Sequence, residues 1–446
     1  MKRVITYGTY DLFHEGHYNL IKRAKALGDY LIVGVTTEQY DEYRGKVGVV
    51  EPLSKRIENI RKTGFVDEII VEDHVGQKVE DVQKYAIDIF TVGSDWRGAF
   101  DYLKRFCEVV YLERTKDIST TLLREKIQKI VRLGVVGTGR IAERFIAENK
   151  LVSGTNIGAV YNPHTDSAVK LGQSYEINVY TSDWEAFLEN IDAVYIASPH
   201  ETHYDYAKKA LSAGKHVLCE KPMVLKKSHA EELFALSKKN SLVLMEAIKT
   251  AYAPGFIKLL SIAQIGSIGK IYDVEACSTK LTVGNVRELT SSVGGSFTEL
   301  ASYPLLAVIK LFGKDYKDIR FEFFNNQRGL DIYTKAYLKY NHGIASIKVG
   351  LGVKSEGQLL ISGSKGYIIV EAPWWKTQGF EVRYEDQSRN EKFFVKYSGE
   401  GLRYEVVEFV NMINNPNKDG FLLTAGESIA IAGIIERFLM ERDKNG

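Results

Sequence analysis

Residues 4–17 read Val-Ile-Thr-Tyr-Gly-Thr-Tyr-Asp-Leu-Phe-His-Glu-Gly-His and contain the first turn from strand to helix in the chain. The apolar residues before Gly8 predict a buried strand, and apolar residues at helical spacing over 14–27 predict a helix that ends at Gly28. Residues 30–35 predict a second buried strand. A strand, a helix and a further strand in this order indicate a parallel sheet with crossover helices.

The same kind of opening recurs at residues 130–136, Ile-Val-Arg-Leu-Gly-Val-Val, which lead into Gly137 and a predicted helix over 140–148. The chain therefore begins a doubly wound α/β fold twice. From about residue 270 the pattern changes to β-rich segments that nearly alternate between apolar and polar residues, which predicts an α+β domain with a large, mostly antiparallel sheet. These segments are 271–279, 331–340, 343–348, 358–362 and 367–371, and residues 425–441 predict a closing helix.

The 446 residues correspond to about three domains of roughly 150 residues each. We predict a first domain over 1–129, a second α/β domain over 130–250 and a third over 251–446. The first boundary contains no Pro, Gly or Ser linker. Residues 121–129 predict a charged amphipathic helix that runs straight into the second opening strand, so we expect a short and fairly rigid join near residue 130.

Composition narrows the class of protein. The 59 Lys and Arg residues nearly balance the 57 Asp and Glu residues, which excludes a nucleic-acid partner bound through bulk charge. Cys107, Cys219 and Cys277 lie too far apart in sequence to predict a disulfide framework or a metal site. No apolar run approaches the ~20 residues that span a bilayer, and the start at Met1 reads as a strand, not as a signal peptide. We expect a cytoplasmic protein that acts on small molecules, with no membrane or nucleic-acid partner.

Two histidines at the start of the first helix predict a phosphate site. His14 and His17 are three residues apart, so both imidazoles lie on one face beside the positive end of the helix dipole. Imidazoles at that position can stabilise the charge that develops on a phosphoryl group during its transfer. Residues 114–121, Arg-Thr-Lys-Asp-Ile-Ser-Thr-Thr, predict a second phosphate cradle before another helix.

Together with residues 93–98, Gly-Ser-Asp-Trp-Arg-Gly, these motifs resemble the HxGH nucleotidyltransferases over residues 1–128, and within them the glycerol-3-phosphate cytidylyltransferases. The resemblance implies that a polyol phosphate attacks the α-phosphorus of CTP and that pyrophosphate leaves with Mg²⁺. It makes His14 and His17 catalytic. It assigns the nucleotide site to Gly8, Thr9, Tyr10, Asp11, Lys46, Arg56, Asp95, Trp96, Arg114, Ser119 and Thr120. Asp117 and Gly64 depart from the family pattern, which leaves the polyol open.

The second opening contains Gly137-Thr138-Gly139-Arg140-Ile141-Ala142, a GxGxxA turn between a strand and a helix. Small residues there let the backbone approach a dinucleotide pyrophosphate. A further strand, residues 156–161, ends at Asn162, where an acidic residue would favour NAD by binding the ribose 2′-hydroxyl. The absence of that acid favours NADP, and NAD stays open.

Two later strands end in residues suited to a ligand cleft, namely Ser198-Pro199 with His203, and Glu220-Lys221-Pro222. With the GxGxxA turn and residues 294–304, they resemble the Gfo/Idh/MocA oxidoreductases over residues 131–440. The resemblance implies a Rossmann domain followed by an open β-sheet domain for substrate binding and dimerisation, with Lys221 orienting the substrate oxygen. It assigns the NAD(P) site to Gly137, Thr138, Gly139, Arg140, Ile141, Asn162, Ser198, Pro199, His203, Glu220 and Lys221.

The helix after the Gly294-Gly295 turn departs from the family pattern at Glu299, Ala301 and Tyr303. We expect Tyr303 to be the catalytic proton donor, with a pKa lowered by Lys221. No metal site is expected from the protein side chains alone.

Two catalytic units on one chain suggest consecutive reactions. The hypothesis is that one half reduces a ketose or aldose phosphate to a polyol phosphate with NAD(P)H, and the other converts it to a CDP-polyol. Such products feed capsule or teichoic-acid-like polymers. Two alternatives remain: the oxidoreductase half acts on the CDP-linked product, or it is a non-catalytic dimerisation module. A homo-oligomer, dimer or tetramer, is expected.

Overall fold

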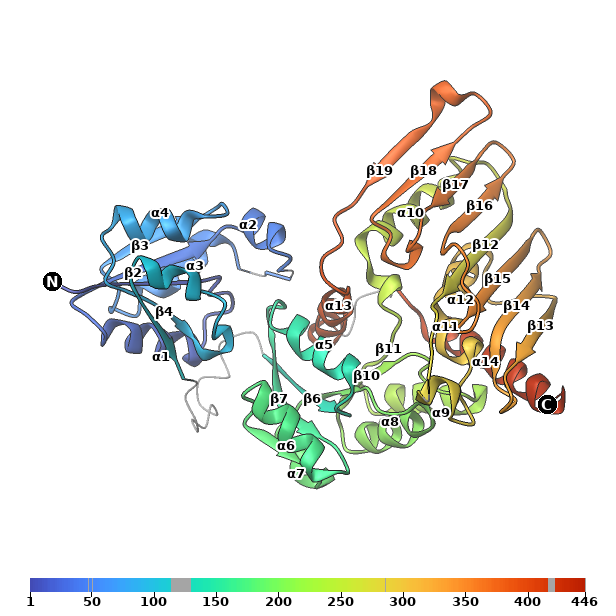
Figure 1. The fold of residues 1–446 in the computed structure, drawn as a ribbon, viewed down its shortest axis with the longest axis horizontal. Helices are drawn as coiled ribbons and strands as arrows, with labels where there is room; N and C mark the ends of the chain where they lie inside the picture. Colours follow the sequence, from blue (N-terminus) through green and yellow to red (C-terminus); the bar gives the residue numbers. More distant parts are fainter. Residues whose placement is uncertain (47, 50, 114–129, 285, 416–421, 446) are drawn as a thin grey trace. The chain divides into compact units, whose positions relative to one another are not determined.

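A computed structural model describes the chain except residues 47, 50, 114–129, 285, 416–421 and 446 (Figure 1). The predicted helix over 121–129 and the first domain boundary lie outside the described residues. Two compact units are present, Met1–Leu133 with Phe145–Asp183, and Gly134–Arg144 with Trp184–Gly446. The predicted domain boundaries stay predictions.

The N-terminal sheet is parallel and has the strand order β3-β2-β1-β4-β5. Its strands are β1 (Arg3–Gly8), β2 (Tyr30–Thr36), β3 (Glu68–Glu72), β4 (Ile89–Gly93) and β5 (Glu108–Leu112). The helices among them are α1 (Glu15–Lys25), α2 (Glu38–Tyr43), α3 (Leu53–Arg61) and α4 (Gln77–Lys84), with 3-10 turns at Ser94–Trp96 and Asp101–Arg105. The order reverses between β1 and β4, and parallel sheets bind ligands at the strand ends beside such a reversal.

Both faces of this sheet are buried. Val4 packs on one face with Ile21 of α1 and Ile60 of α3. Its neighbour Ile5 packs on the other face with Val82 of α4. A strand buried on both faces has a continuous apolar run, and such runs over residues 4–7 and 30–35 are what predicted these two strands from the sequence.

The second sheet has the order β11-β10-β9-β6-β7-β8, which, read from β8, is the 3-2-1-4-5-6 order of a Rossmann fold. Its strands are β6 (Val131–Val136), β7 (Thr155–Tyr161), β8 (Val179–Thr181), β9 (Ala193–Ile196), β10 (His216–Glu220) and β11 (Leu244–Ala247). The helices that alternate with them are α5 (Arg140–Asn149), α6 (Thr165–Ser174), α7 (Trp184–Glu189), α8 (His203–Ser212) and α9 (Lys227–Lys239).

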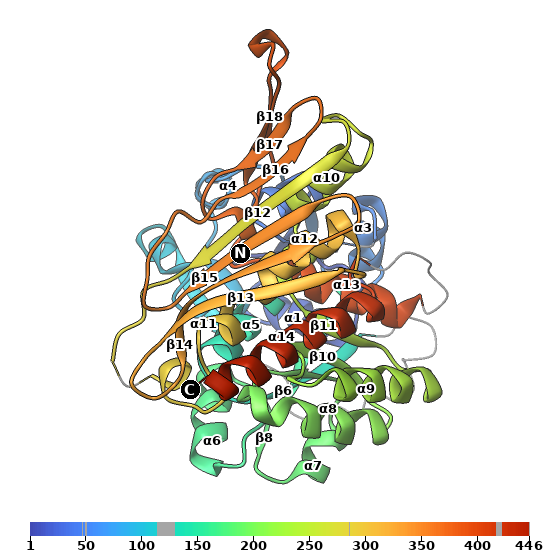
Figure 2. The same ribbon diagram turned by 90° about the vertical axis from the view of Figure 1, so that its right-hand side faces the viewer.

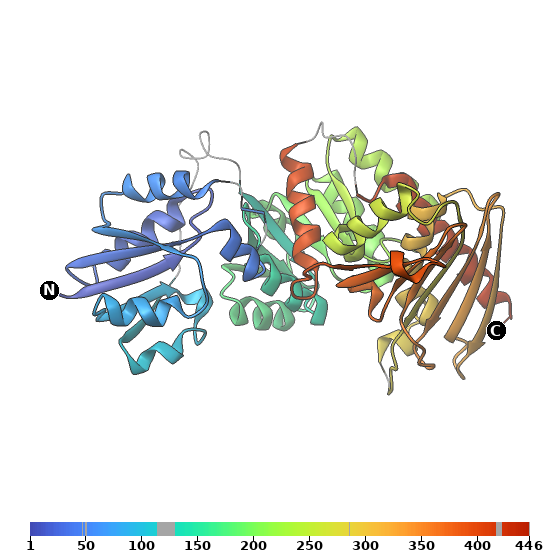
Figure 3. The ribbon, with the colours of Figure 1, turned by 90° about the horizontal axis from the view of Figure 1, so that it is seen from above.

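The third sheet has eight strands in the order β13-β14-β15-β12-β16-β17-β18-β19, antiparallel except for the parallel pair β12 and β15. Its strands are β12 (Ile271–Thr279), β13 (Asp318–Asn325), β14 (Asp331–Lys339), β15 (Ile344–Gly350), β16 (Leu359–Gly363), β17 (Tyr367–Val370), β18 (Gly379–Arg383) and β19 (Glu391–Phe394). Figure 2 shows these strands side by side, and Figure 3 shows the same sheet from above.

The helices of this region are α10 (Pro254–Gln264), α11 (Ser296–Leu300), α12 (Ser302–Phe312), α13 (Leu402–Asn414) and α14 (Ala425–Asn445). Helices α11 and α12 pack on one face of the sheet. Residues on the other face, such as Phe324, Tyr337 and Ile344, are exposed in this chain. The predicted fold class is confirmed, although the sequence patterns missed β13, β18 and β19. No helix within the described part of the chain is long and apolar enough to cross a membrane.

One glycine shows how tightly the second strand-to-helix turn is built. Gly137 follows β6 with φ +98°, and a Cβ placed on it would lie 2.6 Å from the carbonyl oxygen of Ala197. Gly139, two residues later, has open space at the same position. The backbone at Gly137 therefore excludes any side chain, whereas the backbone at Gly139 does not.

We predict that Gly137→Ala destabilises the chain by about 2 kcal/mol, because it combines a positive φ with a backbone clash. Gly139→Ala is the matched control and should change stability by no more than about 0.5 kcal/mol. Thermal unfolding followed by circular dichroism measures both. Equal midpoints for the two variants would contradict the role of Gly137.

Candidate active sites

The first site is built on the loop that follows β1. Thr9 and Asp11 are buried, and Tyr10 and Leu12 have positive φ values of 53° and 47°. His14 caps α1, since its Nδ1 accepts a hydrogen bond from the backbone N–H of Gly16 at 3.0 Å. This loop conformation places the first histidine at the start of the helix.

The structure brings the two predicted catalytic histidines together. The rings of His14 and His17 stack with their centroids 3.8 Å apart. Burial, followed by the charges of His14 and Lys46, holds the pKa of His17 well below its usual value. Its Nδ1 is buried and has no hydrogen-bond partner among the described residues. An anion that binds beside a neutral, desolvated imidazole of this kind stabilises its protonated form, because the opposite charge offsets the cost of burying a charge.

Asp41 anchors the loop to the neighbouring strand. Its carboxylate accepts hydrogen bonds from Thr9 Oγ1 at 3.0 Å and Thr36 Oγ1 at 2.7 Å, and it pairs with Arg44 at 2.5 Å. Asp11 accepts a bond from the backbone N–H of Glu51 at 2.7 Å. The ends of β1 and β2 are thereby held in one arrangement.

Arg56 is fully buried and is committed to backbone groups. Its guanidinium donates to the carbonyl oxygens of Thr9 and Thr36 at 2.8 Å each and to that of Glu51 at 2.9 Å. It also pairs with Glu38 at 3.1 Å. The predicted contact of Arg56 with nucleotide stays a prediction, and in the structure its side chain connects the loop after β1, the end of β2 and the segment before α3.

The remaining predicted nucleotide residues lie at both sides of the strand reversal. A Cβ on Gly8 would meet the ring of Tyr10 at 2.9 Å, so the backbone is closely covered there. Burial lowers the pKa of Lys46, and the charge of Lys46 in turn lowers the pKa of His17. Asp95 and Trp96 follow β4, and Trp96 is 40% exposed with its ring 6.2 Å from that of Phe100. Arg114, Ser119 and Thr120 lie outside the described residues.

The second site begins at the turn from β6 to α5. Gly137 and Gly139 leave the backbone bare, and Thr138 lies between them. Arg140 and Ile141 form the first turn of α5. These features fit a dinucleotide pyrophosphate, because the space that a Cβ would fill is free at Gly139. Asn162, at the end of β7, accepts a hydrogen bond from the backbone N–H of His164 at 2.8 Å.

His203 is buried and lies within hydrogen-bond distance of two loops. Its Nδ1 lies 3.0 Å from the carbonyl oxygen of Pro222, and its Nε2 lies 2.9 Å from that of Ser198. Burial lowers the pKa of His203 to about 3, so it is neutral and donates to only one carbonyl at a time. Pro199 follows Ser198 in the loop after β9 and precedes the 3-10 turn His200–Thr202. Glu220 accepts bonds from the Tyr195 hydroxyl at 2.6 Å and from the backbone N–H of Lys221 at 3.2 Å.

The structure places Lys221 and Tyr303 next to each other. Lys221 Nζ donates to the carbonyl oxygen of Glu299 at 3.0 Å and lies 5.8 Å from the centroid of the Tyr303 ring. The expectation that Tyr303 has a lowered pKa is wrong. Burial and then the carboxylates of Glu220, Glu405 and Glu400 raise the pKa of the phenol above its usual value. The phenol is therefore protonated at neutral pH.

His200 and Glu246, which the sequence analysis did not assign to this site, also lie in it. His200 Nε2 lies 3.0 Å from Glu299 Oε1. Burial acts to raise the pKa of Glu299, but His200, Lys221 and Arg287 outweigh it and lower the pKa to about 2. Glu246 on β11 is buried, which raises its pKa to about 7. His200 follows Pro199 directly, but no spacing in the sequence connects it with Glu299, 99 residues later.

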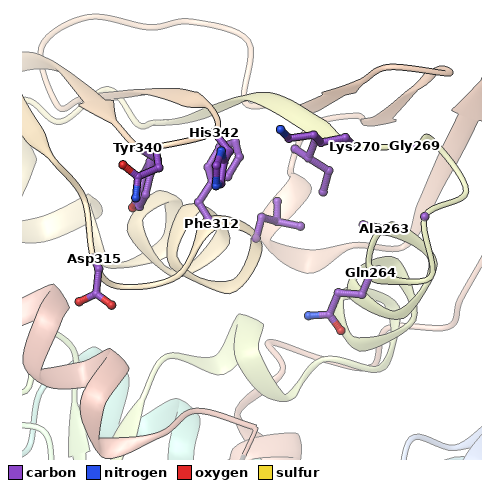
Figure 4. A pocket seen from close by; sticks show the side chains of 12 residues that line it. Ala263, Gln264, Gly269, Lys270, Phe312, Asp315, Tyr340 and His342 are labelled. Carbon is purple, nitrogen blue, oxygen red and sulfur yellow. The ribbon is translucent and has the colours of Figure 1, made fainter.

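A separate hollow of about 540 Å³ lies near the end of α12 (Figure 4). Its lining includes Gln264, Lys270, Phe312, Asp315, Tyr340 and His342, none of which was predicted as a site residue. In the described ranges, no group of three or more His, Cys, Asp or Glu side chains is placed to hold a metal ion.

Comparisons with known proteins match two separate parts of the chain. Residues 5–126 match the cytidylyltransferase-like family, and residues 131–248 match the oxidoreductase family with an NAD-binding Rossmann fold. A glycerol-3-phosphate cytidylyltransferase from Staphylococcus aureus is 46% identical over 28% of this chain and 96% of its own length. The NADP⁺-dependent scyllo-inositol 2-dehydrogenase IolU from Bacillus subtilis is 28% identical over 69% of this chain and 95% of its own length.

Among solved structures, the 3-ketoreductase KijD10 from Actinomadura kijaniata, in complex with NADP and TDP-benzene, aligns with a TM-score of 0.61. The alignment covers 69% of this chain and 96% of KijD10 at 22% sequence identity, and this likeness shows the fold alone. The N-terminal part of the chain belongs to the cytidylyltransferases, residues 131–248 match the Gfo/Idh/MocA oxidoreductase family, and both likenesses support an enzyme with nucleotidyltransferase and NAD(P)-dependent oxidoreductase activities.

Proposed function

We propose that the oxidoreductase half reduces a ketose or aldose phosphate to a polyol phosphate with NADPH, and that the transferase half converts this product to a CDP-polyol. The observation that carries the proposal is the chemistry shared by the two kinds of relative. One has a polyol phosphate, glycerol 3-phosphate, in its name, and the other is named for the oxidation of a polyol with NADP⁺. A reductase that makes a polyol phosphate supplies the acceptor that such a transferase consumes.

In the transferase reaction, a phosphate oxygen of the polyol phosphate attacks the α-phosphorus of CTP. The bond to the β-phosphate breaks, and pyrophosphate leaves. The stacked His14 and His17 lie at the helix start, where they stabilise the charge that develops on the phosphates. Mg²⁺, when bound to the triphosphate, neutralises part of that charge.

In the oxidoreductase reaction, NADPH, when bound, supplies the hydride. Lys221 orients and polarises the substrate carbonyl, and Tyr303 donates its phenolic proton to the carbonyl oxygen, which becomes a hydroxyl. The raised pKa of Tyr303 keeps that proton in place until the oxygen becomes basic. The likeness to the NADP⁺-dependent relative IolU and the absence of an acid at Asn162 both support NADPH.

A CDP-polyol is an activated building block, so we assign the product to cell-surface polymer synthesis. We also propose that two chains pair through the outer face of the eight-stranded sheet. Phe324 and Ile344 on that face are 68% and 58% exposed in the single chain, and pairing would cover them.

Product analysis by mass spectrometry tests the order of the reactions. We expect a CDP-polyol from CTP, Mg²⁺, NADPH and one member of a panel of three- to six-carbon ketose and aldose phosphates. The product should disappear when NADPH is omitted. A CDP-polyol formed only from ready-made polyol phosphates would contradict the order and favour a non-catalytic oxidoreductase half. If the enzyme reduces a CDP-linked carbonyl compound with NADPH, that result would favour reduction after cytidylyl transfer.

His17→Ala should lower the rate of pyrophosphate release about 100-fold or more, because the variant loses transition-state charge stabilisation. NADPH oxidation should stay unchanged. His74→Ala is the matched control, since His74 is an exposed imidazole paired with Asp73 and Glu80. A coupled pyrophosphate assay measures the rate, and a near-normal rate for His17→Ala would remove its catalytic role.

Tyr303→Phe and Lys221→Ala should each lower the rate of NADPH oxidation about 100-fold, because general-acid catalysis is lost or the carbonyl is no longer polarised. Pyrophosphate release from ready-made polyol phosphate should not change. Tyr102→Phe, at an exposed tyrosine outside the oxidoreductase half, is the control. Since the phenol pKa is raised, the wild-type rate should show no loss from Tyr303 ionisation up to about pH 9. Unchanged turnover in both variants would remove these roles.

A further inference from the structure

Three cations from three separate elements converge on one carboxylate oxygen in the oxidoreductase half. Arg144 of α5, Lys249 and Lys376 lie 3.7, 3.8 and 3.7 Å from Glu400 Oε2. Lys249 begins the 3-10 turn Lys249–Tyr252, and Lys376 ends the 3-10 turn Trp374–Lys376. We call Arg144, Lys249 and Lys376 the cation cluster.

The cation cluster lies beside the proposed catalytic groups. Glu400 acts on the pKa of Tyr303, and the charge of Glu220 acts on that of Lys249. The ring of Trp375, the neighbour of Lys376, stacks on Tyr303 with 6.5 Å between centroids. A group bound by the cluster therefore lies near Tyr303, whose ring is next to Lys221.

The lysines of the cluster are poorly hydrated. The Lys249 side chain is 13% exposed and that of Lys376 is 26% exposed, and burial lowers the pKa of Lys249. The buried Glu405 also acts on Lys249. Partly desolvated cations bind an anion more strongly than surface lysines do, because less water screens the interaction.

Glu400 is held on a loop, not within a helix or strand. It lies between Gly399 and Gly401, which have φ values of +62° and +84°, and its side chain is 38% exposed. Glu400 brings one negative charge to the point where the three cations meet, and the carboxylates of Glu405 and Glu220 also act on Lys249. A phosphate has up to two negative charges and three terminal oxygens, so it satisfies the same cations more fully.

We propose that the cation cluster binds the phosphate group of the substrate that the oxidoreductase half reduces, and that Glu400 holds the cluster in place until the phosphate displaces it. This inference rests on the proposed function, because it gives the carbonyl substrate a phosphate. The cofactor has other sites for its own phosphates. Its pyrophosphate is expected at the first turn of α5, and its 2′ group at Asn162, whereas Arg144 lies in the second turn.

The test titrates inorganic phosphate into the full chain and follows tryptophan fluorescence, with the variant His17→Ala as background to weaken phosphate binding by the transferase. Lys249→Gln and Lys376→Gln should each raise the dissociation constant of phosphate about tenfold, the scale of a charge-assisted hydrogen bond. Glu400→Gln should lower it several-fold by removing the competing carboxylate. Lys238→Gln, at an exposed position in the last turn of α9, loses the same charge and should have no effect.

NADPH affinity should stay within about twofold in every variant. Unchanged phosphate affinity in the cluster variants and in Glu400→Gln would overturn the proposal, and so would a loss of NADPH affinity in place of phosphate affinity. Steady-state kinetics separate this inference from the proposed function. A sugar phosphate reduced with unchanged KM by Lys249→Gln and Lys376→Gln would overturn the phosphate site alone. Phosphate binding that depends on the cluster, without reduction of any sugar phosphate, would support the site and contradict the proposed substrate.

Discussion

The right-handedness of crossover connections constrains both parallel sheets and determines where chemistry is placed. Each sheet reverses its strand order beside the strand that opens it, between β1 and β4 in one and between β6 and β9 in the other. Helices on the two sides of such a reversal pass to opposite faces, so they leave the carboxyl ends of the two strands uncovered. Gly8 and Gly137 follow these two opening strands directly. The loops that carry the candidate residues therefore begin at the points that helices do not cover.

Burial then sets the protonation state of each candidate catalytic group. Desolvation penalises a charge, so it keeps the imidazole of His17 neutral and the phenol of Tyr303 protonated. Glu299 is the reverse case, because His200, Lys221 and Arg287 outweigh the desolvation and keep its carboxylate ionised. The same physical effect thus removes the positive charge of His17 and keeps the proton on Tyr303.

Two candidate residues illustrate the difference between lying in a motif and pointing at a ligand. Arg56 and His203 both match positions that the family resemblance assigns to ligand binding. In the structure each is buried and bonded to backbone carbonyl oxygens of neighbouring loops. Their contribution through these contacts is to position Thr9, Ser198 and Pro222. Such a role depends on where a side chain points, which residue identity does not specify.

The sequence by itself determined the elements and the local motifs. Continuous apolar runs identified strands buried on both faces, alternation identified most of the antiparallel sheet, and the glycine turns and His14 with His17 identified two sites, because these signals arise between residues close in the chain. Strands β13 and β18 were missed although both alternate between buried apolar and more exposed residues, and β19 was missed because its four residues show no such alternation. Only the tertiary structure decided the contact of His200 with Glu299, the raised pKa of Tyr303, and the meeting of Arg144, Lys249 and Lys376 at Glu400. These features depend on desolvation and on distances between residues far apart in sequence, and both arise only when the chain has packed.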